Sequence, residues 1–158
     1  MYLAHAWDGL LMVDGAARLF DVPEFLGGLV ADFGEGSVVI LTGVNAGPVL
    51  VTVATTSSAP DLDHTATWED IVEASVEADD SGLDGMVVVG PEDEPPAESA
   101  RLDVHGGGWY RLRVSARGRD IAYDLTTDEP VEHYLVQAWP QAPSPPSVIA
   151  ASSRLSRE

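Results

Sequence analysis

Short apolar runs separated by turn-forming residues are the feature that most limits what this chain can fold into. Runs rich in Val, Ile, Trp and Tyr alternate with clusters of Gly, Pro, Asp and Asn, a pattern typical of β-strands joined by turns. Turn signals recur about every 8–12 residues, without an internal repeat of fixed period. The pattern predicts an all-β fold: a two-layer β-sandwich, or a distorted barrel, of roughly eight to nine mainly antiparallel strands.

The clearest strand is expected at residues 68–78. The even-numbered positions there are mostly apolar, whereas Glu69, Glu73 and Glu77 occupy odd-numbered positions. Because side chains alternate between the two faces of a strand, one face would be buried and the other solvated. Residues 85–89 are apolar on both faces, as expected of a central strand, and residues 131–139 predict the last strand.

Two hairpins and one short helix complete the expected elements. Residues 37–41 and 48–54 flank a Gly- and Asn-containing connection that suits a β-hairpin. Residues 101–105 and 109–117 flank three consecutive glycines and predict a second hairpin, with Tyr110, Leu112, Val114 and Ala116 on its core face. Residues 24–33 would form a short helix, which two glycines weaken.

The chain length is that of one domain. Its 158 residues, 45% of them hydrophobic, suffice for one buried core. We expect a single β-sandwich domain at residues 1–139, followed by a flexible Pro/Ser-rich tail at residues 140–158. The sequence leaves the oligomeric state open.

Charge is distributed very unevenly along the chain. Between Arg18 and Arg101 there is no lysine or arginine, yet those 82 positions hold 17 carboxylates, and the net charge of the whole chain is −18. Such a stretch repels polyanions and attracts basic surfaces. We therefore expect a basic protein as partner, and no direct binding of nucleic acid, which would need a basic stripe.

Two groups of carboxylates are the candidate partner-binding residues. They are Glu69, Glu73 and Glu77 on the solvated face of one strand, and Glu92, Asp93 and Glu94 in a proline-flanked loop. Their mutual repulsion opposes folding, so a cationic partner that relieved it would bind favourably.

Arg111, Arg113 and Arg117 share the non-core face of the predicted strand 109–117. Guanidinium groups bind carboxylates and phosphates bidentately, so this face is a candidate anion-binding site. The alternative, which we favour, is cross-strand pairing with the face that carries Glu69, Glu73 and Glu77.

Signatures of catalysis and of metal binding are missing from the sequence. The acidic turn at residues 79–85 fails the EF-hand spacing because Pro91 stands where the bidentate glutamate is needed. The four histidines are scattered, no cysteine is present, and no nucleophile or nucleotide motif occurs. We predict no metal site, no cofactor and no enzymatic activity.

From residue 68 to residue 139, a series of motifs points to a known family. The motifs are Trp-Glu-Asp at 68–70, a small-residue turn and apolar strand at 82–89, Arg-Leu-Asp-Val at 101–104, Gly-Trp-Tyr-Arg-Leu at 108–112 and the closing strand at 134–136. In this order they resemble the competence protein J family of bacterial nuclease inhibitors. The runs at 108–113 and 132–140 are also similar to uncharacterised bacterial proteins. The resemblance implies an inhibitor of a nuclease, without assigning any inhibitory residue.

These observations converge on a non-enzymatic, acidic protein-binding domain. It would act as an inhibitor or immunity-type partner of a basic enzyme such as a nuclease. The N-terminus lacks the features of a secretory signal and no run is long enough to span a membrane, so we expect a cytoplasmic protein. The alternative is a small-ligand or cation-binding β-module that uses the turn at 79–84 or the arginine face.

Overall fold

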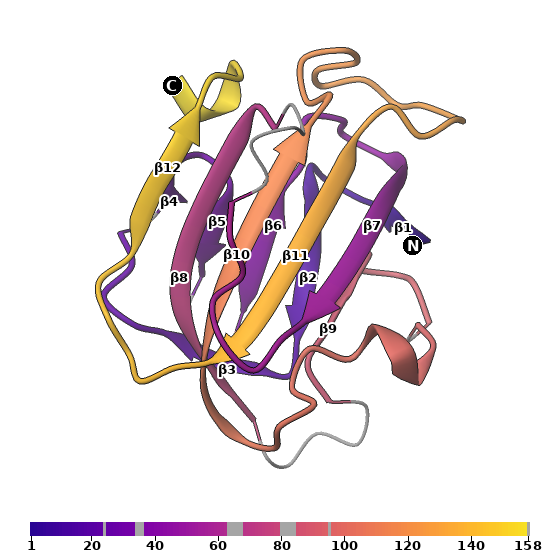
Figure 1. The fold of residues 1–158 in the computed structure, drawn as a ribbon. Helices are drawn as coiled ribbons and strands as arrows, with labels where there is room; N and C mark the ends of the chain where they lie inside the picture. The colour runs from indigo at the N-terminus through magenta and orange to yellow at the C-terminus, as the bar shows by residue number, and fades with distance from the viewer. Residues whose placement is uncertain (24, 34–36, 63–67, 80–84, 95, 158) are drawn as a thin grey trace.

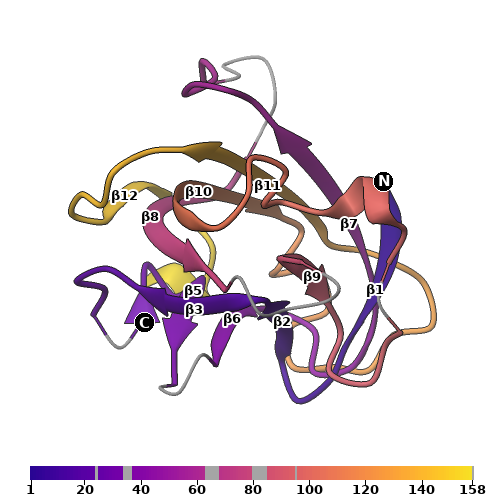
Figure 2. The ribbon, with the colours of Figure 1, turned by 90° about the horizontal axis from the view of Figure 1, so that it is seen from below.

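The computed structural model confirms the all-β prediction: two sheets pack face to face as a sandwich (Figure 1). The structure describes residues 1–158 except 24, 34–36, 63–67, 80–84, 95 and 158, and except the side chain of Glu98. Figure 2 shows the two layers edge-on. The described residues form twelve strands and two short 3-10 helices, η1 (Glu98–Ala100) and η2 (Leu155–Arg157). Neither helix is long and apolar enough to cross a membrane.

The larger sheet has seven strands and the smaller has five. In spatial order the larger contains β1 (Tyr2–Ala6), β7 (Gly47–Thr55), β11 (His133–Pro140), β10 (Gly108–Arg117), β8 (Asp70–Ala78) and β12 (Ser147–Ala151), and β3 (Ala16–Leu19) also pairs with β8. The smaller contains β4 (Phe25–Leu26), β5 (Val30–Asp32), β6 (Val38–Leu41), β2 (Leu10–Asp14) and β9 (Val87–Val89). Among the described strands, every pair is antiparallel except β7 with β11, which is parallel.

The core lies between the sheets and is built from side chains aligned across neighbouring strands. In the larger sheet, Leu112 stands between Ala74 and Ala138, and all three are buried. In the smaller sheet, Ile40 stands between Val30 and Leu11, also buried. Burying one such leucine or isoleucine side chain contributes about 1.5–3 kcal/mol, so these rows hold the layers together.

Several predicted strands are confirmed. β8 alternates as expected, with its even-numbered residues buried and its glutamates half-buried, and β10 buries the predicted core face. β11 lies where the last strand was expected. β9 is buried along its whole length, but of the strands in the described part of the chain it pairs with β2 alone, so the central position expected for it is wrong.

Neither predicted hairpin forms. β6 belongs to the smaller sheet and β7 to the larger, so the connection between them crosses from one layer to the other. Residues 101–105 form a loop instead of a strand. Side-chain hydrogen bonds from this segment and to its backbone take the place of strand pairing. The Asp103 carboxylate accepts from the Met86 amide, and the Tyr110 hydroxyl binds both the His105 amide and the Gly106 carbonyl.

The helix expected at residues 24–33 is also wrong, apart from residue 24, which lies outside the described part. β4 and β5 pair there as a hairpin. Gly27 and Gly28 have φ angles of +58° and +63°, which glycine tolerates and a right-handed helix excludes. The two glycines therefore form the turn of the hairpin.

The structure corrects the tail expected at residues 140–158. β12 pairs with the first half of β8, although it is largely exposed to solvent. Beyond β12, Ser153 is fully buried and its amide donates to Asp70. The composition of the segment did not predict this strand, because its pairing partner, β8, lies far away in the sequence.

Candidate functional site

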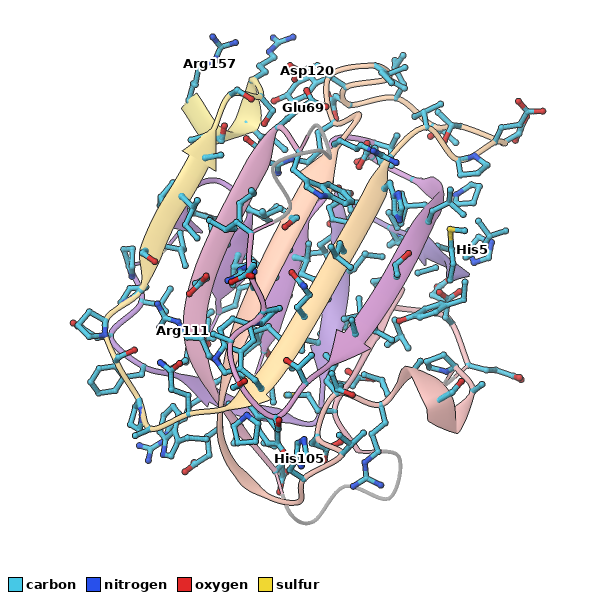
Figure 3. The ribbon with its side chains drawn as sticks, in the orientation of Figure 1. His5, Glu69, His105, Arg111, Asp120 and Arg157 are labelled. Carbon is cyan, nitrogen blue, oxygen red and sulfur yellow. The ribbon has the colours of Figure 1, made fainter. Side chains whose placement is uncertain are left out.

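The arginine face of β10 is used internally. Arg111 and Arg113 are each 5% exposed, and both bind Glu73 of the neighbouring strand, with Nε–O distances of 3.3 and 2.9 Å. Arg111 also donates to the carbonyls of Ser144 and Pro145, and the Arg113 guanidinium lies 5.2 Å from the Trp139 ring centroid. The cross-strand pairing favoured from the sequence is confirmed for these two arginines. Their guanidinium groups are occupied by the protein itself (Figure 3 shows Arg111).

The three glutamates expected on the solvated face of residues 68–78 have different partners. Glu73 bridges the two buried arginines, and Glu77 pairs with Arg18 at 3.2 Å. Glu69 accepts a hydrogen bond from the Gly118 amide. The structure therefore separates this predicted partner-binding group into three local contacts.

The second acidic group lies in the loop that follows β9. Asp93 accepts from the amides of His5 and Gly90 and contacts the His5 ring at 2.9 Å. Glu92 and Glu94 are exposed on either side of it. Asp93 thus fixes the loop to β1, whereas its two neighbours present their carboxylates to solvent.

A surface that the sequence did not single out is formed by the loop between β10 and β11, residues 118–132, here called the acidic loop. Its backbone is bonded to the connection between β6 and β7. The Asn45 amide donates to the Leu125 carbonyl at 2.8 Å, and the Asp124 amide donates to the Gly43 carbonyl at 2.8 Å. Gly118, with φ +85°, begins the loop where a side chain would collide with the Val131 carbonyl. The loop is therefore held in one position although it is long and irregular.

A buried ion pair fixes the start of this loop. Arg119 and Asp70 are both fully buried and their charged groups lie 2.9 Å apart. Arg119 also donates to the carbonyls of Gly28 and Leu41 and to the Ser153 hydroxyl. Burial alone would raise the pKa of Asp70, but hydrogen bonds from the C-terminal serines and the charge of Arg119 outweigh it and lower that pKa. Arg119 thus connects both sheets, the acidic loop and the C-terminal segment.

A second buried carboxylate fixes the end of the loop. Glu132 is 1% exposed and accepts from the amides of Gly43 and Val44 and from the Tyr134 hydroxyl. Burial raises the pKa of Glu132, although these hydrogen bonds oppose the shift. Both ends of the acidic loop are therefore anchored by charged side chains inside the molecule.

The outer side of the acidic loop combines apolar and acidic groups. Ile121 and Leu125 are 69% and 59% exposed. The same loop carries the exposed carboxylates of Asp120, Asp124, Asp128 and Glu129. Asp124 has a φ of +60°, an uncommon conformation for a residue with a side chain. Carboxylates spaced around two large apolar residues were the signal available in the sequence.

Beside the acidic loop lies a hollow of about 450 Å³. Its apolar wall consists of Leu50, Ile121, Pro130 and Val131. Its charged lining includes Glu69 and Asp120, which Figure 3 shows at the same end of the molecule, and Arg117. Arg117, the third arginine of the candidate anion-binding face, is exposed, unlike Arg111 and Arg113.

Arg117 is held by aromatic neighbours. Its guanidinium lies 4.9 Å from the Trp68 ring centroid and 3.2 Å from Nδ1 of His133. Because arginine only donates, Nδ1 of His133 must accept, and its other ring nitrogen donates to the Thr52 hydroxyl at 2.9 Å. Burial and the nearby Arg117 charge lower the pKa of His133, which keeps the ring neutral at pH 7.

In the part of the chain that the structure describes, no group of three His, Asp or Glu side chains could hold a metal ion. The acidic turn proposed at 79–84 lies outside it except for Asp79. No family model, curated protein or solved structure matches this chain. The resemblance to the competence protein J family therefore stays a prediction.

Proposed function

We propose that this protein acts by binding a basic protein, and that the acidic loop is the contact surface. The observation that carries the proposal is the exposure of Ile121 and Leu125 among four exposed carboxylates on a loop anchored at both ends. Protein interfaces combine an apolar centre with a polar rim, and a loop already held in place has little conformational entropy to lose on binding.

The other carboxylate groups fit this role less well. Glu73 and Glu77 are already paired with arginines of the same chain, so a partner's cations would have to compete with them. Glu92 and Glu94 are exposed, and they stay a candidate for a second contact. The acidic loop, in contrast, also carries two large exposed apolar residues, Ile121 and Leu125.

A basic enzyme such as a nuclease is the class of partner that this chemistry suits. Its substrate cleft is cationic in order to bind phosphates, and carboxylates of an inhibitor can occupy the same positions. A chain with a net charge of −18 would be steered toward such a cleft over long distances at low salt. The proposed activity is inhibition by covering the cleft, without chemistry on a substrate.

The test is affinity capture from a bacterial lysate at low salt, followed by measurement with the purified partner. We expect the wild-type protein to retain a basic protein that the variant Ile121→Ser/Leu125→Ser does not. Surface plasmon resonance should then show that Asp128→Asn/Glu129→Gln lowers the association rate constant. Higher salt should reduce the rate constant of the wild-type protein as well.

The matched control is Glu92→Gln/Glu94→Gln, which removes the same charge from the other exposed acidic loop. If this variant slows association as much as Asp128→Asn/Glu129→Gln does, net charge and not the acidic loop determines binding. Retention of the same proteins by the Ile121→Ser/Leu125→Ser variant would refute the acidic loop as the contact surface. Thermal melting of each variant verifies that it is folded.

A further inference from the structure

Charges of opposite sign line the hollow beside the acidic loop without neutralising one another. Arg117 forms no ion pair with a carboxylate among the residues that the structure describes, although Glu69 and Asp120 line the same hollow. Exposed ion pairs are weak, so contacts that hold each charged group in another position are enough to keep these charges apart.

Each charged group is held apart by the rest of the structure. Arg117 lies against Trp68 and donates to the neutral His133 ring. Glu69 accepts from the Gly118 amide, and Asp120 accepts from the Arg154 amide at 3.0 Å. Every one of these contacts leaves hydrogen-bonding capacity unused: a second carboxylate oxygen on each acid, and further N–H groups on Arg117.

The groups also lie close enough for one small molecule to meet them together. Glu69 binds the amide of the residue that follows Arg117 in the chain, so the two side chains reach the hollow from adjacent positions. A volume of about 450 Å³ accommodates a molecule the size of an amino acid. Leu50, Ile121, Pro130 and Val131 offer such a molecule an apolar wall.

We infer that this hollow binds a small zwitterion, namely an α-amino acid with an apolar side chain. Its carboxylate would bind Arg117, its ammonium group would bind Glu69 and Asp120, and its side chain would lie against the apolar wall. A simple anion would be repelled by the net charge of −18, whereas a zwitterion has no net charge and escapes this repulsion. This inference does not rest on the proposed binding of a basic protein, although Asp120 and Ile121 belong to both surfaces.

The test is titration of the protein with L-leucine, followed by two-dimensional amide NMR. We expect concentration-dependent shifts at Gly118, Ile121 and His133, and saturation. N-acetyl-leucine lacks the ammonium group and leucine amide lacks the carboxylate, so each should bind about tenfold more weakly than leucine. Equal binding of all three compounds, or no shift at these amides, would overturn the inference.

Two variants locate the binding in the hollow. Arg117→Gln and Asp120→Asn should each weaken leucine binding by about fivefold to tenfold, because each removes one charged contact from a partly solvated site. The controls Arg157→Gln and Asp128→Asn make the same changes in charge outside the hollow and should leave the affinity unchanged. A control that weakened binding as much as its counterpart in the hollow would also overturn the inference. Neither result depends on whether a basic protein binds the acidic loop.

Discussion

Two carboxylates, Asp70 and Glu132, are buried away from water, and different partners compensate each of them. Asp70 is neutralised by Arg119 and receives the amides of Ser152 and Ser153. Glu132 has no cation at ion-pair distance among the described residues and depends on two backbone amides and a tyrosine hydroxyl. The pKa of Asp70 is accordingly lowered, whereas burial raises that of Glu132.

Replacing Asp70 by asparagine should destabilise the fold strongly at pH 7. The Arg119 guanidinium would then be buried without a countercharge, and breaking a buried pair in this way costs about 3–5 kcal/mol. Urea denaturation at pH 7 measures the loss directly. A difference from wild type below about 1 kcal/mol would contradict this account of the pair, because such values are typical of exposed ion pairs.

The cost of this substitution should also depend on pH. The pKa of Asp70 is lowered from 3.8, so its contribution to stability is present above pH 3.8 and is lost as the pH falls through the lower folded-state pKa. The difference in unfolding free energy between wild type and Asp70→Asn should therefore shrink as the protein is acidified below pH 3.8. Denaturation curves recorded at a series of pH values below 3.8 test this, and a constant difference would show that the carboxylate is not the source of the stabilisation.

Side-chain alternation was predictable from the sequence at this scale, but the partners of charged residues were not. The pattern of β10 shows which of its residues face the core, and the pairing of Arg111 and Arg113 follows from it. Arg119 carries no such signal, because its burial depends on Asp70, which lies 49 positions away. Nothing local distinguishes Arg119 from a solvated arginine.

At the scale of elements, β12 is the strand whose position departs most from the sequence prediction. It covers one edge of β8, and the residues after it complete the shell around Asp70 and Arg119. The sequence suggested a mobile tail because Pro and Ser dominate residues 140–147. Strand propensity is judged from residues adjacent in the sequence, whereas the formation of an edge strand depends on the strand that it pairs with.

Removing residues 147–158 should therefore destabilise the protein. Asp70 would lose the two amides that bind it, and β8 would lose its partner over Asp70–Glu73. We expect a loss of more than about 2 kcal/mol, the cost of leaving buried polar groups unsatisfied. Thermal denaturation of the shortened chain measures this loss of stability. An unchanged melting temperature would support the flexible tail predicted from the sequence.

The two missed hairpins have a common cause. A turn signal such as that in residues 42–47 shows where the chain changes direction, but not whether the flanking strands pair. In this fold β6 and β7 leave that turn for different sheets, and the side-chain bonds of Asp103 and Tyr110 take the place of a ladder in residues 101–105. The sequence therefore indicates the fold class well and the order of the strands poorly.

At the scale of the whole molecule, the net charge of −18 opposes compaction. The ion pairs of Arg111, Arg113 and Arg119 are buried and little affected by salt, whereas salt screens the repulsion among exposed carboxylates. Raising the NaCl concentration from about 0.01 M to about 1 M shortens the Debye length from about 30 Å to about 3 Å. We expect the melting temperature to rise by several degrees, at about 2–4 °C for each kcal/mol gained.

Calorimetry over this range of salt is the measurement. The variant Asp128→Asn/Glu129→Gln lacks two of the exposed negative charges, so its melting temperature should rise less with salt than that of the wild type. A melting temperature that falls with salt would indicate that exposed ion pairs stabilise the protein more than the exposed carboxylates destabilise it.

The position of β11 has a consequence for how this chain is made. β11 joins the pair formed by β1 and β7 to the strands around β8 and β10, so it completes the middle of the larger sheet (Figure 1). Yet it spans residues 133–140, so it leaves the ribosome after every other described strand of this sheet except β12. Until then β7 and β10 each present an unpaired edge, and the two halves of the sheet have nothing to connect them. Assembly of the larger sheet is thus delayed until β11 has been synthesised, and repulsion among the carboxylates keeps the unfinished chains from associating with one another.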